Sequence, residues 1–189
     1  MGEITRCTWP GTDPLYIAYH DTEWGVPVRD DATLFEFLIL ETFQAGLSWI
    51  TVLRKRENFR KAFDDFNYQK IAQYSESKVE ALMQDAGIIR NRLKIKATIT
   101  NAKAFMNIQK ELGSFSSYIW GFTDGKVIQH NYSNRSNLPA TTELSDKISK
   151  DLKKRGFKFV GSTVIYAHLQ ATGMVNDHVT SCFRHKALS

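Results

Sequence analysis

Helix start and stop signals punctuate nearly the whole chain, and they constrain its fold more than any other feature. Asp13-Pro14 combines an N-cap residue with a proline at the first helical position, and Gly113 ends a long amphipathic run over residues 92–112. Apolar residues recur at helical spacing between such signals, whereas no segment shows a sustained alternation of apolar and polar residues. The pattern predicts an all-α fold with short loops.

Similar signals place the other helices. Asp30 or Asp31 can cap a helix, Ser48 can cap the next, and Ser77 with Glu80 has capping-box spacing. The further predicted helices cover residues 34–45, 49–63, 79–86, 142–155 and 159–172. Between them, the polar segment 123–141 contains the turn signal Asp124-Gly125 and is expected to be an exposed, irregular excursion.

Composition removes several classes of protein. With 189 residues, of which 42% are hydrophobic, the chain can form one globular unit, residues 1–189, built of two helical lobes. Two cysteines are too few for a disulfide scaffold, and no signal peptide or membrane-spanning apolar run is evident. We therefore expect a cytoplasmic protein without a membrane partner. The net charge of +5 permits a polyanionic partner without requiring one.

The stretch NDHVTSC near the C-terminus carries His178 and Cys182 four positions apart. The other cysteine, Cys7, has His20 as its nearest histidine, so the four residues make a two-thiolate, two-imidazole set suited to structural zinc. Such a metal would join the two ends of the chain. Spacing alone leaves open two unrelated reduced cysteines and two ordinary histidines. His168 lies on an apolar helix face, where a satisfied core histidine is expected.

Glu41 is a carboxylate on an apolar helix face. Leu34, Leu38, Glu41 and Ala45 follow helical spacing, which directs Glu41 toward the core. A carboxylate in that position is costly unless it is paired or functional, although an apolar helix can also turn it to its least buried edge.

Aromatic residues cluster near Glu41 in the sequence and in the N-terminal segment. Trp49 follows the helix break after Glu41, and Trp9, Tyr16, Tyr19 and Trp24 lie close together in the chain. These rings could wall a pocket in which a nucleobase stacks while a carboxylate accepts its hydrogen bonds. The alternative is that the rings fill the core.

A glycine-containing bend joins two predicted helices at Gly87, with Ile89 in the bend. Backbone N–H groups before a helix N-terminus can hold a phosphate, as in a helix-hairpin-helix DNA-binding element. Cations that would strengthen such binding follow in the sequence: Arg90, Arg92, Lys94 and Lys96.

The chain resembles the 3-methyladenine DNA glycosylase I family of the helix-hairpin-helix glycosylase superfamily. The matching stretches are DPLYIAYHDTEWGVP, QAGLSWITVLRKREN, DAGIIRNR, KKRGFKFVGSTV and GMVNDHV. They extend over nearly the whole chain, from Cys7 to Cys182, and omit the segment near 123–141. The resemblance implies a helix-hairpin-helix fold and base excision repair of alkylated double-stranded DNA.

The resemblance also implies roles for individual residues. One structural Zn²⁺ would be bound by the cysteines and histidines from both termini. The family's pocket glutamate matches Glu41 as the catalytic and base-binding residue, and its aromatic walls match Tyr19 and Trp49. Leu47 matches a wedge into the base stack. The remaining residues expected near the base or on the DNA are Trp9, Tyr16, Trp24, Gly87, Ile89 and Arg90.

Two departures from the superfamily affect the expected chemistry. Ile89 replaces the second hairpin glycine, and residues 161–176 contain no Asp or Glu to stabilise the reaction. No lysine occupies a nucleophile motif, so we expect a monofunctional enzyme that releases 3-methyladenine and leaves an abasic site. We also expect a monomer. The alternatives are a zinc-stabilised DNA-binding module without glycosylase activity and a related glycosylase for another alkylated purine.

Overall fold

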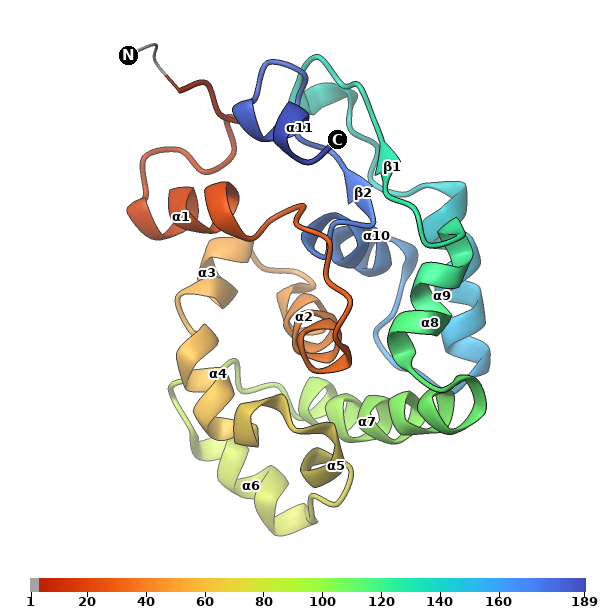
Figure 1. Ribbon diagram of the computed structural model, residues 1–189. Coiled ribbons are helices and arrows are strands. Elements are labelled where there is room, and N and C mark those ends of the chain that lie inside the picture. The colour runs from red at the N-terminus through yellow and green to blue at the C-terminus, as the bar shows by residue number, and fades with distance from the viewer. Residues whose placement is uncertain (1–3) are drawn as a thin grey trace.

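Helices dominate the computed structural model, which describes residues 4–189 (Figure 1). In chain order the elements are α1 (Pro14–Thr22), α2 (Asp31–Gln44), α3 (Trp49–Leu53), α4 (Arg56–Ala62), η1 (Asp64–Phe66), α5 (Tyr68–Ile71), α6 (Glu76–Gln84), α7 (Arg92–Leu112), α8 (Phe115–Trp120), η2 (Gly121–Thr123), β1 (Ile128–Gln129), η3 (Arg135–Asn137), α9 (Glu143–Lys154), α10 (Ser162–Ala171), β2 (Val175–Asn176) and α11 (Phe183–Ala187). The predicted helical class is confirmed, with one parallel pair of two-residue strands, β1 and β2, as an addition.

Several boundaries follow from the local signals in the sequence. The Asp13 carboxylate accepts hydrogen bonds from the N–H groups of Leu15 and Tyr16 at the start of α1, and Asp30 caps α2. Gly113 ends α7 with a φ of 87°, which L-residues with a side chain rarely adopt.

Several predicted boundaries differ from the structure, and α10, for example, begins at Ser162 and not at residue 159. The helix expected over 49–63 is divided into α3 and α4, and between them the Lys55 ammonium donates to the carbonyl groups of Ala86 and Gly87. A contact with a distant loop therefore fixes the chain at this break. The N-cap of α6 is Ser75, which accepts from the Lys78 N–H, whereas the hydroxyl of Ser77 pairs with that of Ser75.

Helix α2 occupies the centre of the fold. Figure 1 shows it surrounded by α3, α7 and α10, and α2 makes contacts with each of them. Its sequence is apolar on nearly all faces, which is typical of a helix buried on all sides. The polar side chains of Glu41 and Thr42, on its second half, are therefore held inside the protein.

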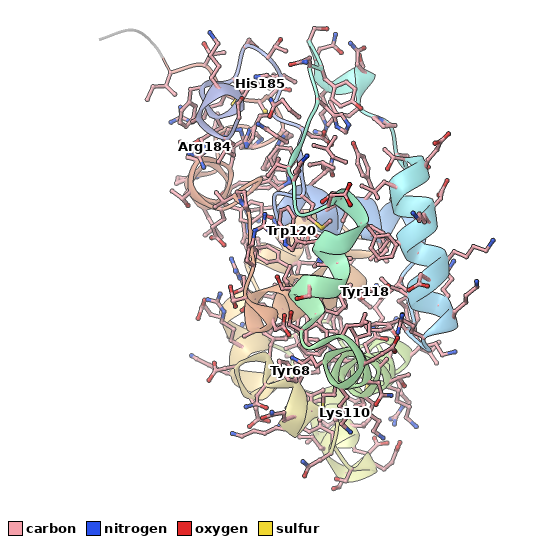
Figure 2. The ribbon with its side chains drawn as sticks, turned by 45° about the vertical axis from the view of Figure 1, so that its right-hand side comes forward. Tyr68, Lys110, Tyr118, Trp120, Arg184 and His185 are labelled. Atoms are coloured by element: carbon pink, nitrogen blue, oxygen red, sulfur yellow. The ribbon has the colours of Figure 1, made fainter. Side chains whose placement is uncertain are left out.

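The two ends of the chain lie together. Figure 1 shows the N-terminal segment beside α11, and the Phe183 N–H donates to the Thr5 carbonyl at 3.0 Å. Strand β2 brings the C-terminal segment against β1, with Ile128 opposite Val175. Figure 2 shows Trp120 on the adjoining helix α8, and its indole N–H donates to the Val28 carbonyl at 2.8 Å. Within residues 4–189, no helix combines the length and apolar character needed to cross a membrane.

His168 departs from its prediction. It is fully buried on α10, as expected, but neither ring nitrogen has a hydrogen-bond partner among the described residues. Burial lowers the pKa of the imidazole to about 4, so the ring is neutral at physiological pH.

Candidate active site

A cavity of about 510 Å³ gathers residues from both ends and the middle of the chain. Helices α1, α2, α3 and α10 contribute to its wall, together with the N-terminal segment, residues 133–139 and residues 177–181. Its volume is in the range of small-molecule sites. All the residues predicted to bind a base line this one cavity: Trp9, Tyr16, Tyr19, Trp24, Glu41 and Trp49.

Glu41 is the buried polar group in the cavity wall. Its side chain comes from the last turns of α2, the residue is only 3% exposed, and its Oε2 atom has no hydrogen-bond partner among residues 4–189. Burial raises the pKa of the carboxyl from 4.5 to about 8. An unpaired acceptor of this kind costs free energy in the folded protein and is available to a ligand that brings a donor or a positive charge.

Tyr19 and Trp49 stand beside Glu41 in the same wall. Their ring centroids are 5.4 Å apart, with an angle of 41° between the ring planes. The indole Nε1 of Trp49 is buried without a partner, so the wall holds an unsatisfied donor as well as an unsatisfied acceptor. Burial, followed by the Glu41 charge, raises the pKa of Tyr19, which remains a neutral phenol. The wall can thus both stack against a planar ring and hydrogen-bond to its edge.

The other three aromatic residues form a second layer around Trp9. The Trp9 ring lies 4.8 Å from Tyr16 and 5.1 Å from Trp24, measured between centroids. Trp24 also packs edge-on against the His178 ring at 4.6 Å. This layer therefore connects the cavity to the cysteine and histidine cluster at the termini.

The turn between α2 and α3 lies at the edge of the cavity. Gly46 has a φ of 84°, and Leu47 beside it is 42% exposed. The Lys94 ammonium donates to the carbonyls of Phe43 and Ala45 at 2.9 and 2.7 Å, which fixes the C-terminal end of α2. Leu47 is therefore an exposed apolar side chain on a turn whose preceding helix end is held by hydrogen bonds. A residue that wedges into DNA requires such support.

The bend at Gly87 does join α6 to α7, as the sequence predicted. The Gly87 N–H, however, donates to the Asp85 carboxylate at 2.7 Å, so it is already engaged within the loop. Backbone N–H groups of Ile89 and Arg90 have no acceptor within residues 4–189. These two groups are free to receive a phosphate, whereas Gly87 serves the loop geometry.

Three of the four cations expected beside this bend are engaged elsewhere. Arg92 forms ion pairs with Glu80 and Glu76, and Lys96 pairs with Glu76 at 3.0 Å. Lys94, on α7, is buried against the C-terminal end of α2, and burial lowers the pKa of its ammonium group. Arg90 is exposed and has no acidic partner in the described part of the chain. The sequence could not distinguish these cations, because their partners are set by tertiary contacts.

A second group of predicted residues also comes together. Cys7, His20, His178 and Cys182 are all buried, and one ligand atom from each lies within 4.8 Å of the others. The Cys182 Sγ is 3.5 Å from both His20 Nε2 and His178 Nδ1, and the Cys7 Sγ is 3.6 Å from His178 Nδ1. The alternative of unrelated cysteines and histidines is wrong, since the four donors converge on one point.

The remaining nitrogen of each histidine is held from outside the cluster. His20 Nδ1 lies 2.7 Å from the Asp21 carboxylate, which in turn pairs with Arg6, and His178 Nε2 lies 3.0 Å from the Trp24 carbonyl. Partners of this kind fix the ring orientation and the tautomer of metal ligands. The hydrogen bond from the Cys7 thiol lowers the pKa of Cys182, which favours the thiolate form that binds metal ions. These four residues can hold a metal ion.

The cavity wall includes residues that were not predicted from the sequence, among them a stretch of the polar segment and Asp177. Residues 133–139, from the segment expected to be an exposed excursion, line it. Asp177 lines it too, and its buried carboxylate accepts from Tyr166, from Gln170 at 2.7 Å and pairs with His130 at 2.5 Å. No spacing in the sequence identifies these residues, because tertiary contacts bring them together, namely the β1–β2 pairing, the His130–Asp177 pair and the hydrogen bond from the Thr180 N–H to the Tyr132 carbonyl.

Comparison with known proteins identifies the family of the chain. A family model described as methyladenine glycosylase matches residues 9–185. DNA-3-methyladenine glycosylase 1 of Escherichia coli (strain K12) is 52% identical over 179 residues, covering 95% of this chain and 96% of that protein. A crystal structure of 3-methyladenine DNA glycosylase I has 51% identity and a TM-score of 0.93, covering 95% of this chain and 98% of that one.

A third relative connects the fold to base recognition. The structure that describes 3-methyladenine recognition by the Staphylococcus aureus 3-methyladenine DNA glycosylase I is 36% identical, with a TM-score of 0.92, and covers 96% of this chain and 97% of that one. The family model, which matches residues 9–185, includes Glu41, Tyr19 and Trp49 of the cavity and His20, His178 and Cys182 of the cluster. The chain belongs to the methyladenine glycosylase family, specifically its 3-methyladenine DNA glycosylase I members.

Proposed function

We propose that this protein is a monofunctional DNA-3-methyladenine glycosylase, which flips N3-methyladenine out of duplex DNA and hydrolyses its N-glycosidic bond. The observation that carries the proposal is the unpaired Oε2 of Glu41, buried beside Tyr19 and Trp49 in a cavity large enough for a base. A DNA-binding module without activity would not need a buried carboxylate at such a cost. The family to which the chain belongs supports the same activity.

The charge of the lesion explains why Glu41 can select it. N3-methyladenine is a cation while it is attached to deoxyribose, so it attracts an anionic carboxylate and lowers the raised pKa of that group. Glu41 would accept hydrogen bonds from the base edge, and the rings of Tyr19 and Trp49 would stack on its face. A normal, neutral adenine gains no such attraction and also unstacks from the duplex at greater cost.

The same charge explains how a site with few polar groups can catalyse hydrolysis. A cationic base is a good leaving group, so its glycosidic bond breaks with less assistance than that of a neutral base. Water then attacks the anomeric carbon, and the products are free 3-methyladenine and an abasic site. No lysine lines the cavity among the described residues, which supports hydrolysis over attack by an amine.

DNA would be held at two places near the cavity. Leu47 would enter the base stack from the turn after α2, where it is exposed beside Gly46. The bend at Gly87 would bind a backbone phosphate through the N–H groups of Ile89 and Arg90, with Arg90 as the unpaired cation. This hairpin contact is weaker than the sequence suggested, because the neighbouring cations are paired or buried.

The cysteine and histidine cluster would bind one structural Zn²⁺. In a tetrahedral zinc site, Zn–S bonds of about 2.3 Å and Zn–N bonds of about 2.05 Å place S and N ligand atoms about 3.6 Å apart. Three separations between Sγ and imidazole nitrogen, from Cys7 to His178 and from Cys182 to His20 and His178, are 3.5 to 3.6 Å, so the residues fit this ion. Four protein ligands leave no open position, and the ion would hold the two termini together.

We further propose that the chain acts as a monomer and as one functional unit. Its two helical lobes would share the continuous apolar core that runs from Tyr19 to Val175, with the cavity at their junction. The cytoplasm is the proposed location, because chromosomal DNA is the substrate of such an enzyme.

A base-release experiment tests the activity. Duplex DNA treated with a methylating agent is incubated with zinc-loaded wild-type protein, Glu41→Gln or the control Glu143→Gln, and the free bases are identified by mass spectrometry. Glu143 is exposed at the start of α9, so its variant should match the wild type. We expect free 3-methyladenine from the wild type and at least 10-fold less from Glu41→Gln, on the scale of a lost charged hydrogen bond.

The outcomes separate the alternatives. Equal release of 3-methyladenine by all three proteins would exclude a role for Glu41 and would still support glycosylase activity. Release of a different alkylated purine would show a related glycosylase. No release from folded wild-type protein that still binds abasic DNA would establish a DNA-binding module.

A further inference from the structure

Two arginines line the cavity, and only one of them has an acidic partner. The Arg6 guanidinium is paired with Asp21 at 2.8 Å, and Asp21 also contacts His20 in the metal cluster. Arg135, on η3, is exposed and forms no ion pair within residues 4–189. The wall of the cavity therefore presents one positive charge that the folded chain leaves free.

The segment that carries Arg135, residues 130–139, is called the rim segment below. Its beginning is fixed to the segment that carries the metal ligands. His130 pairs with the buried Asp177 carboxylate, the Tyr132 carbonyl accepts from the Thr180 N–H at 2.9 Å, and His185 Nε2 lies 2.8 Å from the His130 carbonyl. The rim segment is thus held by several contacts to residues 177–185 and does not lie free in solvent.

The turn around Arg135 is also braced locally. The Asn137 backbone N–H donates to the Asn134 carbonyl at 3.2 Å, and the Asn137 side chain donates to the Ser133 hydroxyl at 3.1 Å. The Ser136 hydroxyl donates to the Asn134 side chain. A braced turn loses less conformational entropy when it binds a partner than a free loop does.

The positive charge of Arg135 indicates which kind of group it binds. Arg135 lines the same cavity as Tyr16 and Trp9, so its guanidinium belongs to the wall that also holds the aromatic layer. A cation there repels the cationic lesion and cannot be a base-recognition group. When a base enters the cavity, its own sugar and phosphates must remain at the mouth, and arginine binds phosphate through charge-assisted hydrogen bonds.

We propose that Arg135 binds a DNA backbone phosphate next to the flipped nucleotide, so that the rim segment is a further DNA contact beside Leu47 and the Gly87 bend. The inference rests on the proposed glycosylase function. The residues that support the rim segment, Asp177, Thr180 and His185, lie in the same stretch of chain as His178 and Cys182 of the cluster.

The test measures DNA binding as a function of salt. Wild type, Arg135→Gln, Arg135→Lys and Lys110→Gln are compared by fluorescence anisotropy on a duplex that contains one abasic-site analogue. Lys110 is an exposed cation at the end of α7, and Figure 2 shows it at the opposite end of the molecule from His185, which contacts the rim segment. Its variant removes the same charge without touching the cavity. Binding of free 3-methyladenine, followed by tryptophan fluorescence, is measured for each protein.

We expect Arg135→Gln to bind the duplex on the order of 5- to 10-fold more weakly at low salt, and to reduce the slope of log K against log salt by about 0.9. Arg135→Lys should retain most of the slope, because it keeps the charge. Free 3-methyladenine should bind all four proteins equally, which a disturbed cavity would not allow.

The proposal is overturned if Arg135→Gln has the same affinity and salt slope as Lys110→Gln, or if Arg135→Gln weakens binding of free base and DNA alike. Base release by the wild type is scored separately on methylated DNA. Its absence would contradict the proposed glycosylase, while the difference between the two Gln variants would still decide the phosphate contact.

Discussion

The buried carboxylate of Glu41 should make the protein less stable as pH rises. Its pKa is about 8 in the folded chain and 4.5 in an exposed position. Between these two values the folded state keeps a proton that the unfolded state has lost, so the free energy of unfolding falls with increasing pH. Glutamine does not titrate, and Glu41→Gln should remove this fall.

The size of the effect follows from the difference between the two pKa values, 4.5 and about 8. Each unit corresponds to about 1.4 kcal/mol, so Glu41→Gln gains about 5 kcal/mol over the wild type between pH 4 and pH 9. At pH 7 about 3 kcal/mol of that gain is present. The wild type gives up this stability to keep an acceptor for a cationic base, as expected when function requires a destabilised site.

Urea unfolding measures this difference. Zinc-loaded wild type and Glu41→Gln are unfolded at five pH values from 5 to 9, at one zinc concentration, and the two free energies are subtracted. Both proteins contain the same cysteine and histidine cluster, so its own dependence on pH cancels in the difference. Glu143→Gln is the control, because its exposed carboxylate should give a difference that does not depend on pH.

A difference between wild type and Glu41→Gln that stays constant from pH 5 to 9 would refute the reasoning. The carboxylate would then ionise in the folded protein as easily as in the unfolded chain. In that case the cavity would not hold an unsatisfied acid, and selection of a cation by Glu41 would lose its physical basis.

Three further predictions concern other parts of the site. Trp49→Phe keeps the stacking surface but removes the unpaired indole N–H, so we expect about 5-fold weaker binding of free 3-methyladenine by fluorescence titration; unchanged affinity would mean that this donor does not meet the base. Leu47→Ala should slow base release from duplex DNA at least several-fold and leave binding of free base unchanged, and equal rates would exclude the wedge. Cys182→Ser, or a chelator added to the wild type, should lower the melting temperature by roughly 10 °C, whereas identical melting with and without chelator would exclude a structural metal.

Local features of the sequence determined much of the fold. The helix boundaries at Asp13, Asp30 and Gly113 depend on hydrogen bonds and backbone angles within a few residues, so the sequence predicts them directly. Glu41 could be found for a similar reason, because helical spacing alone places it on the buried face of α2. The metal ligands could be grouped because the chain offers only two cysteines.

Other features depend on which distant segments meet. The Lys94 ammonium supports the end of α2, because it lies within hydrogen-bond distance of the carbonyls of Phe43 and Ala45. Arg92, which was also expected beside the DNA, forms an ion pair with Glu80. Neither contact can be predicted from residue spacing or composition. Which group a long, flexible cationic side chain contacts depends on how the whole chain packs.

The active site illustrates the division most clearly. The sequence predicted Glu41, the aromatic residues and the cluster of two cysteines and two histidines, because their chemistry is unusual for their positions and because the chain resembles a known family. Only the tertiary structure decided that residues 133–139 complete the cavity and that Arg135 is the free cation at its wall. The physical reason is that β1–β2 pairing and the Asp177 network join segments about fifty residues apart, and such contacts form only when the whole chain packs.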